Sequence, residues 1–410
     1  MINKSVLFSP ASIGPLTLRN RTIRAAAFEG MCCRNAPTPQ LYEYHTSVAA
    51  GGIGMTTVAY AAVTRSGLSF SSQLWMKPDI VPGLRNLTDG IKKEGAAASV
   101  QIGHCGNMSH RSICGCMPVS ANSGFNLYSP TLVRGLRRPE IIQIAKDFGQ
   151  ATRLAYESGF DAVEVHAGHG YLLSQFMSTW LNRRKDEYGG SFEHRLRFTR
   201  QAMEEVMEVA AQKNLAVLVK MNMRDGFPGG MELDESLEVA RLLERWGAHA
   251  LVLSGGYVSR APMYVMRGSM PIRTLTHYMP VGYLKLGVRM AGRFMIPSVP
   301  FEEGYFIEDA VKFREAVKIP LVCLGGMSSR AVIERALGKG FDFIGIARAL
   351  VNDPAFVNKM KEAQEKGCGE AYKSACTHAN YCIGRMYTLD MCCHQNRSDI
   401  PKRLLDEFSQ

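Results

Sequence analysis

One pattern recurs along this chain of 410 residues: a short apolar run, a loop rich in glycine or polar residues, and then a stretch with helical periodicity. Runs that are apolar throughout and separated by helices are typical of parallel strands covered on both faces. We expect eight such strands, at residues 22–27, 53–59, 97–102, 162–166, 216–222, 250–254, 320–324 and 341–346.

The helices between these runs are readable in several places. Within residues 140–158 the apolar positions recur with a period near that of an α-helix. Further helices are expected at residues 196–211, 234–246 and 328–337. Eight strand–helix units predict an α/β protein with a (β/α)8 barrel, the TIM barrel. An open, doubly wound sheet is the alternative, and it is disfavoured because no Gly-x-Gly-x-x-Gly follows any of the runs.

Two segments fall outside the repeating pattern. Residues 257–307 form an insertion after the sixth strand that is too long for a simple loop, and we expect it to cap the substrate pocket at the barrel mouth. The insertion carries Arg260, Arg267 and Arg273, which could meet a carboxylate or a thioester phosphate. Residues 366–410 form a cysteine-rich tail, so the barrel domain is expected to occupy residues 1–365.

Composition narrows the class of protein. The net charge is +11, but the basic residues are scattered, so we expect no nucleic-acid partner. No apolar stretch approaches the roughly 20 residues of a membrane span, and the N-terminus has no signal-peptide core, so we expect a cytoplasmic protein that no membrane holds. A disulfide framework is not expected from the eleven cysteines of such a protein, and metal binding is an alternative use for them.

In such a barrel the reactive side chains lie at the carboxyl ends of the strands. Gln101 and Lys220, on the third and fifth strands, would point at whatever lies over the barrel centre. The planar amide suits the edge of a heterocycle, and the ammonium could stabilise a developing anion. Either residue could instead be a satisfied polar group at the rim.

The last two strands predict a phosphate site. Glycines at their ends allow backbone amides to approach an anion, a helix begins near Ser328, and an arginine can pair with phosphate oxygens. The alternative is a pair of tight turns beside a surface arginine. The residues concerned are Gly325, Gly326, Gly345 and Arg348.

His166, His169 and Tyr171 form the densest local cluster of chemically active side chains. The His-x-x-His spacing could bind a metal, but an acidic third ligand has no obvious place. Two imidazoles could also hold a carbonyl or phenolate oxygen, with Tyr171 as a nearby proton donor. Inert core histidines are the third alternative.

The segment around these residues reads Gly159-Phe-Asp-Ala-Val-Glu-Val-His166-Ala-Gly-His169-Gly-Tyr171 and continues to Ser178. Together with other short segments it resembles the old yellow enzyme family of FMN-dependent ene-reductases, from about Leu7 to Asn358. The chain is similar in particular to the NADH:flavin oxidoreductase branch and to the FMN domain of 2,4-dienoyl-CoA reductase. The supporting segments are residues 20–21, 52–54, 101–104, 182–191 and 342–348.

The resemblance implies that FMN lies over the mouth of the barrel and that NAD(P)H donates hydride from the same face, in a ping-pong mechanism. The implied reaction reduces the C=C bond of an enone, an enal or an enoyl thioester. His166 and His169 would clamp the substrate carbonyl, and Tyr171 would protonate the α carbon. The implied FMN-binding residues are Ala27, Ala59, Gln101, Lys220, Ser254, Gly255, Gly325, Gly326, Gly345 and Arg348.

Other functions stay open on the sequence alone. A flavin-dependent amine or alcohol dehydrogenase would use a related barrel in the opposite direction. A flavin electron-transfer subunit would pass electrons to a partner, and a metal-dependent hydrolase or lyase would use His166 and His169 as ligands. A homo-oligomer is compatible with each of these functions.

The chain departs from the family pattern at both ends. The first strand ends in Ala25-Ala-Ala27 and lacks the Thr or Cys that many members place beside the flavin. Longer relatives carry a [4Fe–4S] cluster and a further nucleotide-binding domain. We do not expect the further domain in this chain. The tail resembles the cluster motif with Ala379 in place of one cysteine, so a cluster with an external electron donor, a zinc site and a metal-free tail are all compatible with it. The candidate ligands are Cys376, Cys382, Cys392 and Cys393.

Overall fold

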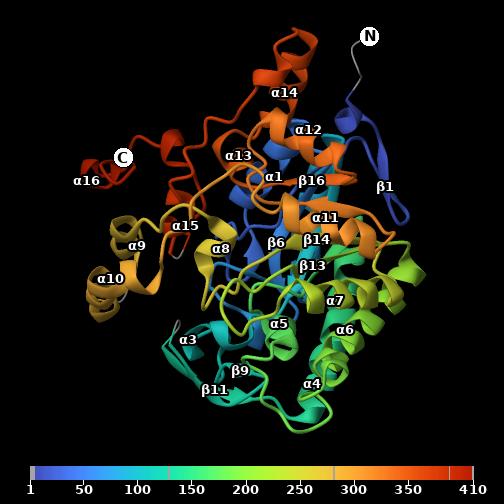
Figure 1. Cartoon of the computed structure of the whole chain (residues 1–410), viewed down its shortest axis with the longest axis vertical. Coiled ribbons are helices and arrows are strands. Elements are labelled where there is room, and N and C mark those ends of the chain that lie inside the picture. Colours follow the sequence, from blue (N-terminus) through green and yellow to red (C-terminus); the bar gives the residue numbers. More distant parts are fainter. Residues whose placement is uncertain (1–4, 128–129, 280–281, 387, 409–410) are drawn as a thin grey trace.

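A computed structural model describes residues 5–127, 130–279, 282–386 and 388–408 of the chain (Figure 1). It confirms the closed barrel, because the pairings of β16 with β3 and of β3 with β6 complete a ring of parallel strands. In ring order the strands are β3 (Thr22–Arg24), β6 (Met55–Ala62), β8 (Ala97–Gly103), β12 (Ala162–His166), β13 (Ala216–Asn222), β14 (Ala250–Ser254), β15 (Leu321–Cys323) and β16 (Phe343–Ile346).

Helices cover the outside of this ring, as the sequence pattern predicts. In α4 (Arg138–Glu157) the buried face includes Ile141, Phe148 and Leu154, which recur at helical spacing. Burial of each such side chain stabilises the fold by about 1.5–3 kcal/mol. The other covering helices are α1 (Pro39–Ala50), α2 (Val81–Lys93), α6 (Phe192–Lys213), α7 (Leu233–Arg245), α11 (Ile307–Ala316) and α12 (Arg330–Gly338).

The first two strands differ from their expected limits. β3 ends at Arg24, three residues early, because the carbonyls of Ala26 and Ala27 accept hydrogen bonds from side chains instead of from a neighbouring strand. β6 begins and ends later than expected, and its pairing with β8 is irregular between Val58 and Ala61. The contact of Lys220 with Ala26 and the irregular pairing of β6 with β8 both involve residues that are distant in the sequence.

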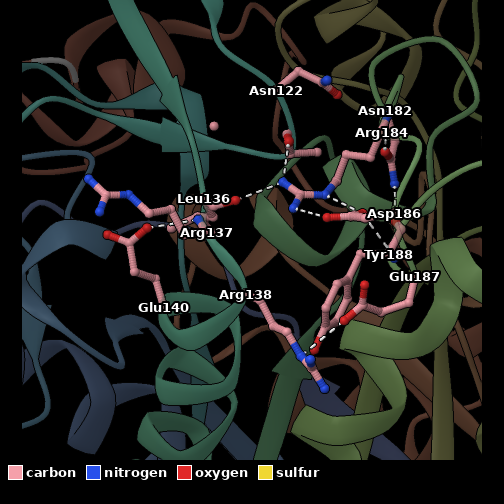
Figure 2. Close-up of polar contacts among 12 residues, drawn as sticks. Asn122, Leu136, Arg137, Arg138, Glu140, Asn182, Arg184, Asp186, Glu187 and Tyr188 are labelled. Atoms are coloured by element: carbon pink, nitrogen blue, oxygen red, sulfur yellow. Dashed lines mark hydrogen bonds and ion pairs between the residues drawn. The ribbon is translucent and has the colours of Figure 1, made fainter.

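A small sheet that the sequence analysis did not predict follows β8. It contains β9 (Val119–Ser120), β10 (Gly124–Asn126) and β11 (Thr131–Gly135), and the short helix α3 (Arg111–Cys114) precedes it. Figure 2 shows how Arg184 holds this sheet: its guanidinium donates to the carbonyls of Ala121 and Leu136 at 2.9 and 2.7 Å and pairs with Asp186. The family-like segment 182–191 therefore includes residues that anchor the small sheet to the barrel.

The insertion after β14 contains α8 (Pro262–Met266), α9 (Ile272–Tyr278) and α10 (Gly282–Met295). Its first part contacts the end of the fourth strand through the bridge between Tyr257 and His169. Helices α9 and α10 lie to one side of the barrel near α15 (Tyr381–Arg385) and α16 (Lys402–Leu405) of the tail (Figure 1). The hydroxyls of Tyr278 and Tyr381 lie 3.0 Å apart at this junction. The capping role of the insertion stays a prediction.

Along the described part of the chain, no helix combines the length and the apolar character that crossing a bilayer would require.

Candidate functional site

Three buried polar side chains meet where β8, β12 and β13 run side by side. Glu164 accepts a hydrogen bond from Gln101 Nε2 at 2.5 Å and forms an ion pair with Lys220 Nζ at 2.8 Å. Each of these residues is at most 3% exposed, so the carboxylate neutralises an ammonium that would otherwise be costly to bury. The sequence analysis found Gln101 and Lys220 but not Glu164. Glu164 could have been found as the single acidic residue within an apolar strand, because a buried acid needs a partner.

Hydrogen-bonding capacity remains in this group. Lys220 Nζ also donates to the carbonyl of Ala26 at 3.3 Å, which leaves one of its three N–H groups unused by these bonds. The side-chain oxygen of Gln101 has no hydrogen-bond partner among the described residues. An amide acceptor and an ammonium donor are thus available to a polar ligand.

The cluster expected on the fourth strand is assembled. The rings of His166 and His169 lie 5.1 Å apart, and that of Tyr171 lies 4.5 Å from His166 and 5.3 Å from Tyr60. His169 has a φ of +57°, an uncommon conformation for a residue other than glycine, and its N–H donates to Asn222 Oδ1. The turn after β12 therefore fixes the second imidazole beside the first.

Both imidazoles are neutral at physiological pH. Burial, the neighbouring His169 and Lys220 hold the pKa of His166 well below its usual range. Burial and Lys220 lower the pKa of His169 to about 3. The metal alternative for these two histidines finds no support in the described residues, where no group of three or more His, Cys, Asp or Glu side chains is arranged to hold an ion.

The hydrogen bonds of the imidazoles restrict their tautomers. His166 Nδ1 accepts a long hydrogen bond of 3.4 Å from the N–H of Gly168, so the ring proton of the neutral form lies on Nε2. His169 Nε2 lies 2.7 Å from the hydroxyl of Ser254, and Nδ1 carries the proton when that hydroxyl donates. Each ring then retains one N–H that these bonds do not use.

The expected cofactor contacts Ala27, just beyond β3, and Ala59, within β6, adjoin a buried ion pair. Arg24 and Glu29 lie 2.7 Å apart, and neither was expected from the sequence. Arg24 donates to the carbonyl of Ala27 at 2.8 Å, and Glu29 accepts from the N–H of Ala59 at 3.1 Å. The carbonyl of Ala27 and the N–H of Ala59 are therefore already hydrogen-bonded to side chains of the protein. The contacts of Ala27 and Ala59 with a cofactor stay a prediction.

Gly255, directly after Ser254, lies in a crowded part of the chain. A Cβ atom there would come within 2.9 Å of the Tyr264 ring and 3.1 Å of the Arg224 carbonyl. The packing of the insertion against the end of β14 therefore excludes a side chain at this position.

The predicted phosphate residues lie at the ends of β15 and β16. Gly325 and Gly326 have φ values of +94° and +70°, which a residue other than glycine rarely adopts. A Cβ at Gly326 would lie 2.7 Å from the carbonyl of Glu302, and one at Gly345 would overlap the side chain of Leu324. Close packing and turn geometry thus both require these glycines.

Arg348 begins α13 (Arg348–Asn352), and a residue of the tail orients its side chain. Its Nη1 donates to Asn380 Oδ1 at 2.7 Å. The amide nitrogen of Asn380 in turn donates to the carbonyls of Arg267 and Ser269 at 2.7 and 3.1 Å. One buried side chain therefore connects the eighth strand, the insertion and the tail.

The hydroxyls at the start of α12 already have a carboxylate partner. Ser328 and Ser329 donate to the two side-chain oxygens of Glu303 at 2.6 and 2.7 Å. An anion bound beside Gly325 would therefore be held by backbone N–H groups and Arg348, and not by these hydroxyls.

The cysteines of the tail are free thiols. Cys376 Sγ lies 3.9 Å from His378 Nδ1, Cys393 Sγ lies 3.5 Å from the side-chain nitrogen of Asn352, and burial raises the pKa of Cys382 to about 12. No three metal-binding side chains of the described residues are arranged around one point, Cys392 included. The metal-binding role of the tail stays a prediction.

Two surface grooves, of about 350 and 560 Å³, lie between α4 and α6 and between α6 and α7. None of the predicted site residues lines either groove.

A (β/α)8 barrel whose mouth brings together an amide, an ammonium and two neutral imidazoles has the fold and the donor set of a flavin-dependent oxidoreductase. The chain belongs to the NADH:flavin oxidoreductase / NADH oxidase family, which matches residues 6–290. The cofactor of this family is FMN, and NAD(P)H is its reductant. The free oxygen of Gln101, the spare N–H of Lys220 and the side chain of Arg348 fit the polar edge and the phosphate of FMN.

Curated relatives agree with this family. The chain is 42% identical over 390 residues to 4,4′-dithiodibutanoate disulfide reductase of Rhodococcus erythropolis, and the alignment covers 94% of each chain. It is 30% identical over 359 residues to a metal reductase of Desulforamulus reducens, with 87% of this chain and 48% of the relative covered. The chain therefore spans about half the length of that second relative.

Solved structures support the fold. A complex of 2-naphthoyl-CoA reductase with 2-naphthoyl-CoA superposes with a TM-score of 0.79 at 22% identity, covering 98% of this chain and 58% of the other. The old yellow enzyme homologue from Zymomonas mobilis superposes with a TM-score of 0.70 at 21% identity, covering 96% and 99%. At these identities the likeness extends to the barrel and not to the substrate.

Proposed function

We propose that this FMN-dependent NAD(P)H oxidoreductase reduces the C=C bond of an α,β-unsaturated carbonyl compound. The observation that supports this proposal is the pair of neutral imidazoles, 5.1 Å apart, with the Tyr171 ring 4.5 Å from one of them. Neutral N–H groups can donate to a carbonyl oxygen and stabilise the negative charge that develops on it. A tyrosine hydroxyl beside them can supply a proton.

Bound FMN would supply the transfer of hydride from NAD(P)H to the acceptor. His166 and His169 would hold the carbonyl oxygen and polarise the conjugated double bond. Tyr171 would deliver a proton to the α carbon, so the acceptor would gain one hydride and one proton while NAD(P)H becomes NAD(P)+. The ammonium of Lys220, which Glu164 holds in place, would offer a positive charge to the cofactor.

Disulfide reduction is a second candidate, because the chain is 42% identical along almost its whole length to a disulfide reductase. The same side chains suit this reaction. Hydride transfer to one sulfur breaks the S–S bond, and the imidazole N–H groups stabilise the departing thiolate until it is protonated. The balance is R–S–S–R + NAD(P)H + H+ giving two R–SH and NAD(P)+.

Anaerobic stopped-flow spectroscopy of the holoprotein distinguishes the two candidates. The protein is first reduced with NADH or NADPH and then mixed with 2-cyclohexenone or with 4,4′-dithiodibutanoate, while the flavin absorbance near its oxidised maximum is followed. We expect fast reoxidation by the enone. Fast reoxidation by the disulfide alone would replace the first proposal with the second.

Two further outcomes would contradict both proposals. Reduction of the flavin by an amine or an alcohol, without NAD(P)H, would indicate a dehydrogenase. Reoxidation by a one-electron dye but by neither acceptor would indicate an electron-transfer subunit.

A further inference from the structure

Arg260, in the loop after β14, is an exposed arginine held above two aromatic rings. Its guanidinium carbon lies 4.7 Å from the ring centre of Trp180 and 5.3 Å from that of Phe227. It forms no ion pair with any acidic side chain of the described residues. The two rings therefore position the Arg260 guanidinium, and its N–H groups are available to a ligand.

The platform beneath this charge is rigid. The rings of Trp180, Phe227 and Tyr257 contact one another edge to face, with centres 5.5 to 6.0 Å apart. Tyr257 is fully buried. A guanidinium on such a platform loses little freedom when it binds an anion, which favours affinity.

The platform belongs to the same edge of the barrel as the candidate site. Tyr257 pairs with His169 in an isolated β-bridge, and the N–H of Val258 donates to the His169 carbonyl at 3.0 Å. Trp180 follows α5 (Leu172–Met177), which begins directly after Tyr171. Phe227 follows β13, the strand of Lys220. The segments that carry the proposed catalytic residues therefore also carry the platform.

Other arginines near the mouth differ from Arg260 in their partners. Arg224 is bound to Asp309 and Glu232, so its charge is already neutralised. Arg267 is partly buried and lies over the rings of Tyr264 and Tyr305 at 4.9 and 4.7 Å. Arg260 is the exposed one of these three, and it has no acidic partner within the described residues.

We propose that Arg260 binds a carboxylate on the substrate, at a distance from the bond that is reduced. This inference rests on the proposed function and narrows it to acceptors that carry a carboxylate. A guanidinium can hold a carboxylate through two parallel hydrogen bonds, which fixes orientation as well as charge. Arg260 is a specificity-determining residue in this arrangement and takes no part in hydride or proton transfer.

The first test compares the Arg260→Gln holoprotein with the unmodified one on 7-oxo-5-octenoate, an enone with a distant carboxylate, and on its methyl ester. Loss of a charged hydrogen-bonded pair is expected to raise KM for the acid about 10–100-fold. We expect little change in kcat, in the rate of flavin reduction by NAD(P)H, or in KM for the ester. Arg260→Lys should recover part of the loss, and Arg293→Gln, at an exposed arginine of α10, is the matched control.

A second test does not depend on turnover. Calorimetric titration of the oxidised holoprotein with adipate, a saturated dicarboxylate, should show binding that Arg260→Gln weakens about 10-fold or more and Arg293→Gln leaves unchanged. Failure of every acceptor with intact adipate binding would reject the proposed function and retain the carboxylate site.

Three results would overturn the inference. One is equal adipate binding by Arg260→Gln and the unmodified protein. Another is an equal loss on acid and ester, which would indicate a structural role. The third is preferential binding of adenosine 3′,5′-bisphosphate at Arg260, which would assign the site to a thioester phosphate instead.

Discussion

Glu164 is the single residue that connects Gln101 and Lys220, the two side chains that the sequence predicts to face the cofactor. It is buried between Gln101 and Lys220, and among the described residues it is the only acidic side chain that forms an ion pair with that ammonium. The interaction joins strands whose partners are 63 and 56 residues apart, so a one-dimensional pattern does not reveal it. The position of Lys220 near the end of a predicted strand identified it as a candidate. Its counter-charge is apparent only from the register of β8, β12 and β13, which places Glu164 beside it.

Replacing Glu164 with Gln should therefore destabilise the protein strongly. The change leaves a buried ammonium without its partner, and we expect the free energy of unfolding to fall by about 3–5 kcal/mol. Urea unfolding of the apoprotein measures this effect. Glu157→Gln, on an exposed position of α4, should change stability by about 0.5 kcal/mol or less. A loss under about 1 kcal/mol for Glu164→Gln would show that the ammonium is compensated elsewhere.

The proposed role of Tyr171 also depends on a single residue, because one hydroxyl would donate the proton. Tyr171→Phe keeps the ring that packs against His166 and Tyr60 and removes the proton donor. We expect reoxidation by an enone to slow about 10²–10⁴-fold, with flavin reduction by NAD(P)H unchanged. Stopped-flow measurement of each half-reaction separates the two effects, and equal losses in both would remove the proton-donor role.

At the scale of elements, the strands were predictable because their burial on both faces produces unbroken apolar runs. β12, β13 and β14 have the limits that the sequence predicts. The small sheet after β8 was not predicted, because β9 and β10 are two and three residues long and too short to show a period. Its position depends instead on contacts with the 182–188 segment (Figure 2).

Arg184 should therefore act as an anchor for an element and not as a reacting group. Arg184→Gln removes the hydrogen bonds to the carbonyls of Ala121 and Leu136. Each of these hydrogen bonds contributes about 0.5–1.5 kcal/mol or more to stability. We expect faster proteolysis within residues 118–137, measured by limited digestion and mass spectrometry. Arg183→Gln, at an exposed neighbouring position, is the control. Equal digestion of both variants would contradict the anchoring role.

For the whole molecule, the number of strand–helix units was enough to predict a closed barrel. The position of α9 and α10 was not predictable, because α9 packs against the tail more than a hundred residues later in the sequence and α10 packs on α9. The insertion and the tail consequently form a lateral unit beside the barrel (Figure 1). The relative positions of the tail cysteines depend on the same packing, so they too could not be predicted from the sequence.

The stability of the whole molecule should fall in mild acid. Burial lowers the pKa of His104 and His169 to about 3 and that of His166 well below its usual range. The unfolded chain binds protons below about pH 6.5, whereas the native state does not, so stability is full above that pH and is lost as the pH falls toward the folded pKa values.

Each of these histidines contributes a slope of up to about 1.4 kcal/mol per pH unit. Urea midpoints measured from pH 7.5 to 5 should decrease accordingly, and His104→Asn should reduce the slope. A midpoint independent of pH over this range would contradict the neutral, buried state of these rings.

Asn380 ties the tail of the chain to both the barrel and the insertion. Its side-chain oxygen accepts from Arg348, and its side-chain nitrogen donates to the carbonyls of Arg267 and Ser269. Loss of this one amide would therefore release an arginine of the barrel and a loop of the insertion together. If Arg348 binds the phosphate of the cofactor and the insertion borders the substrate, the two halves of the site share this one asparagine as a common support.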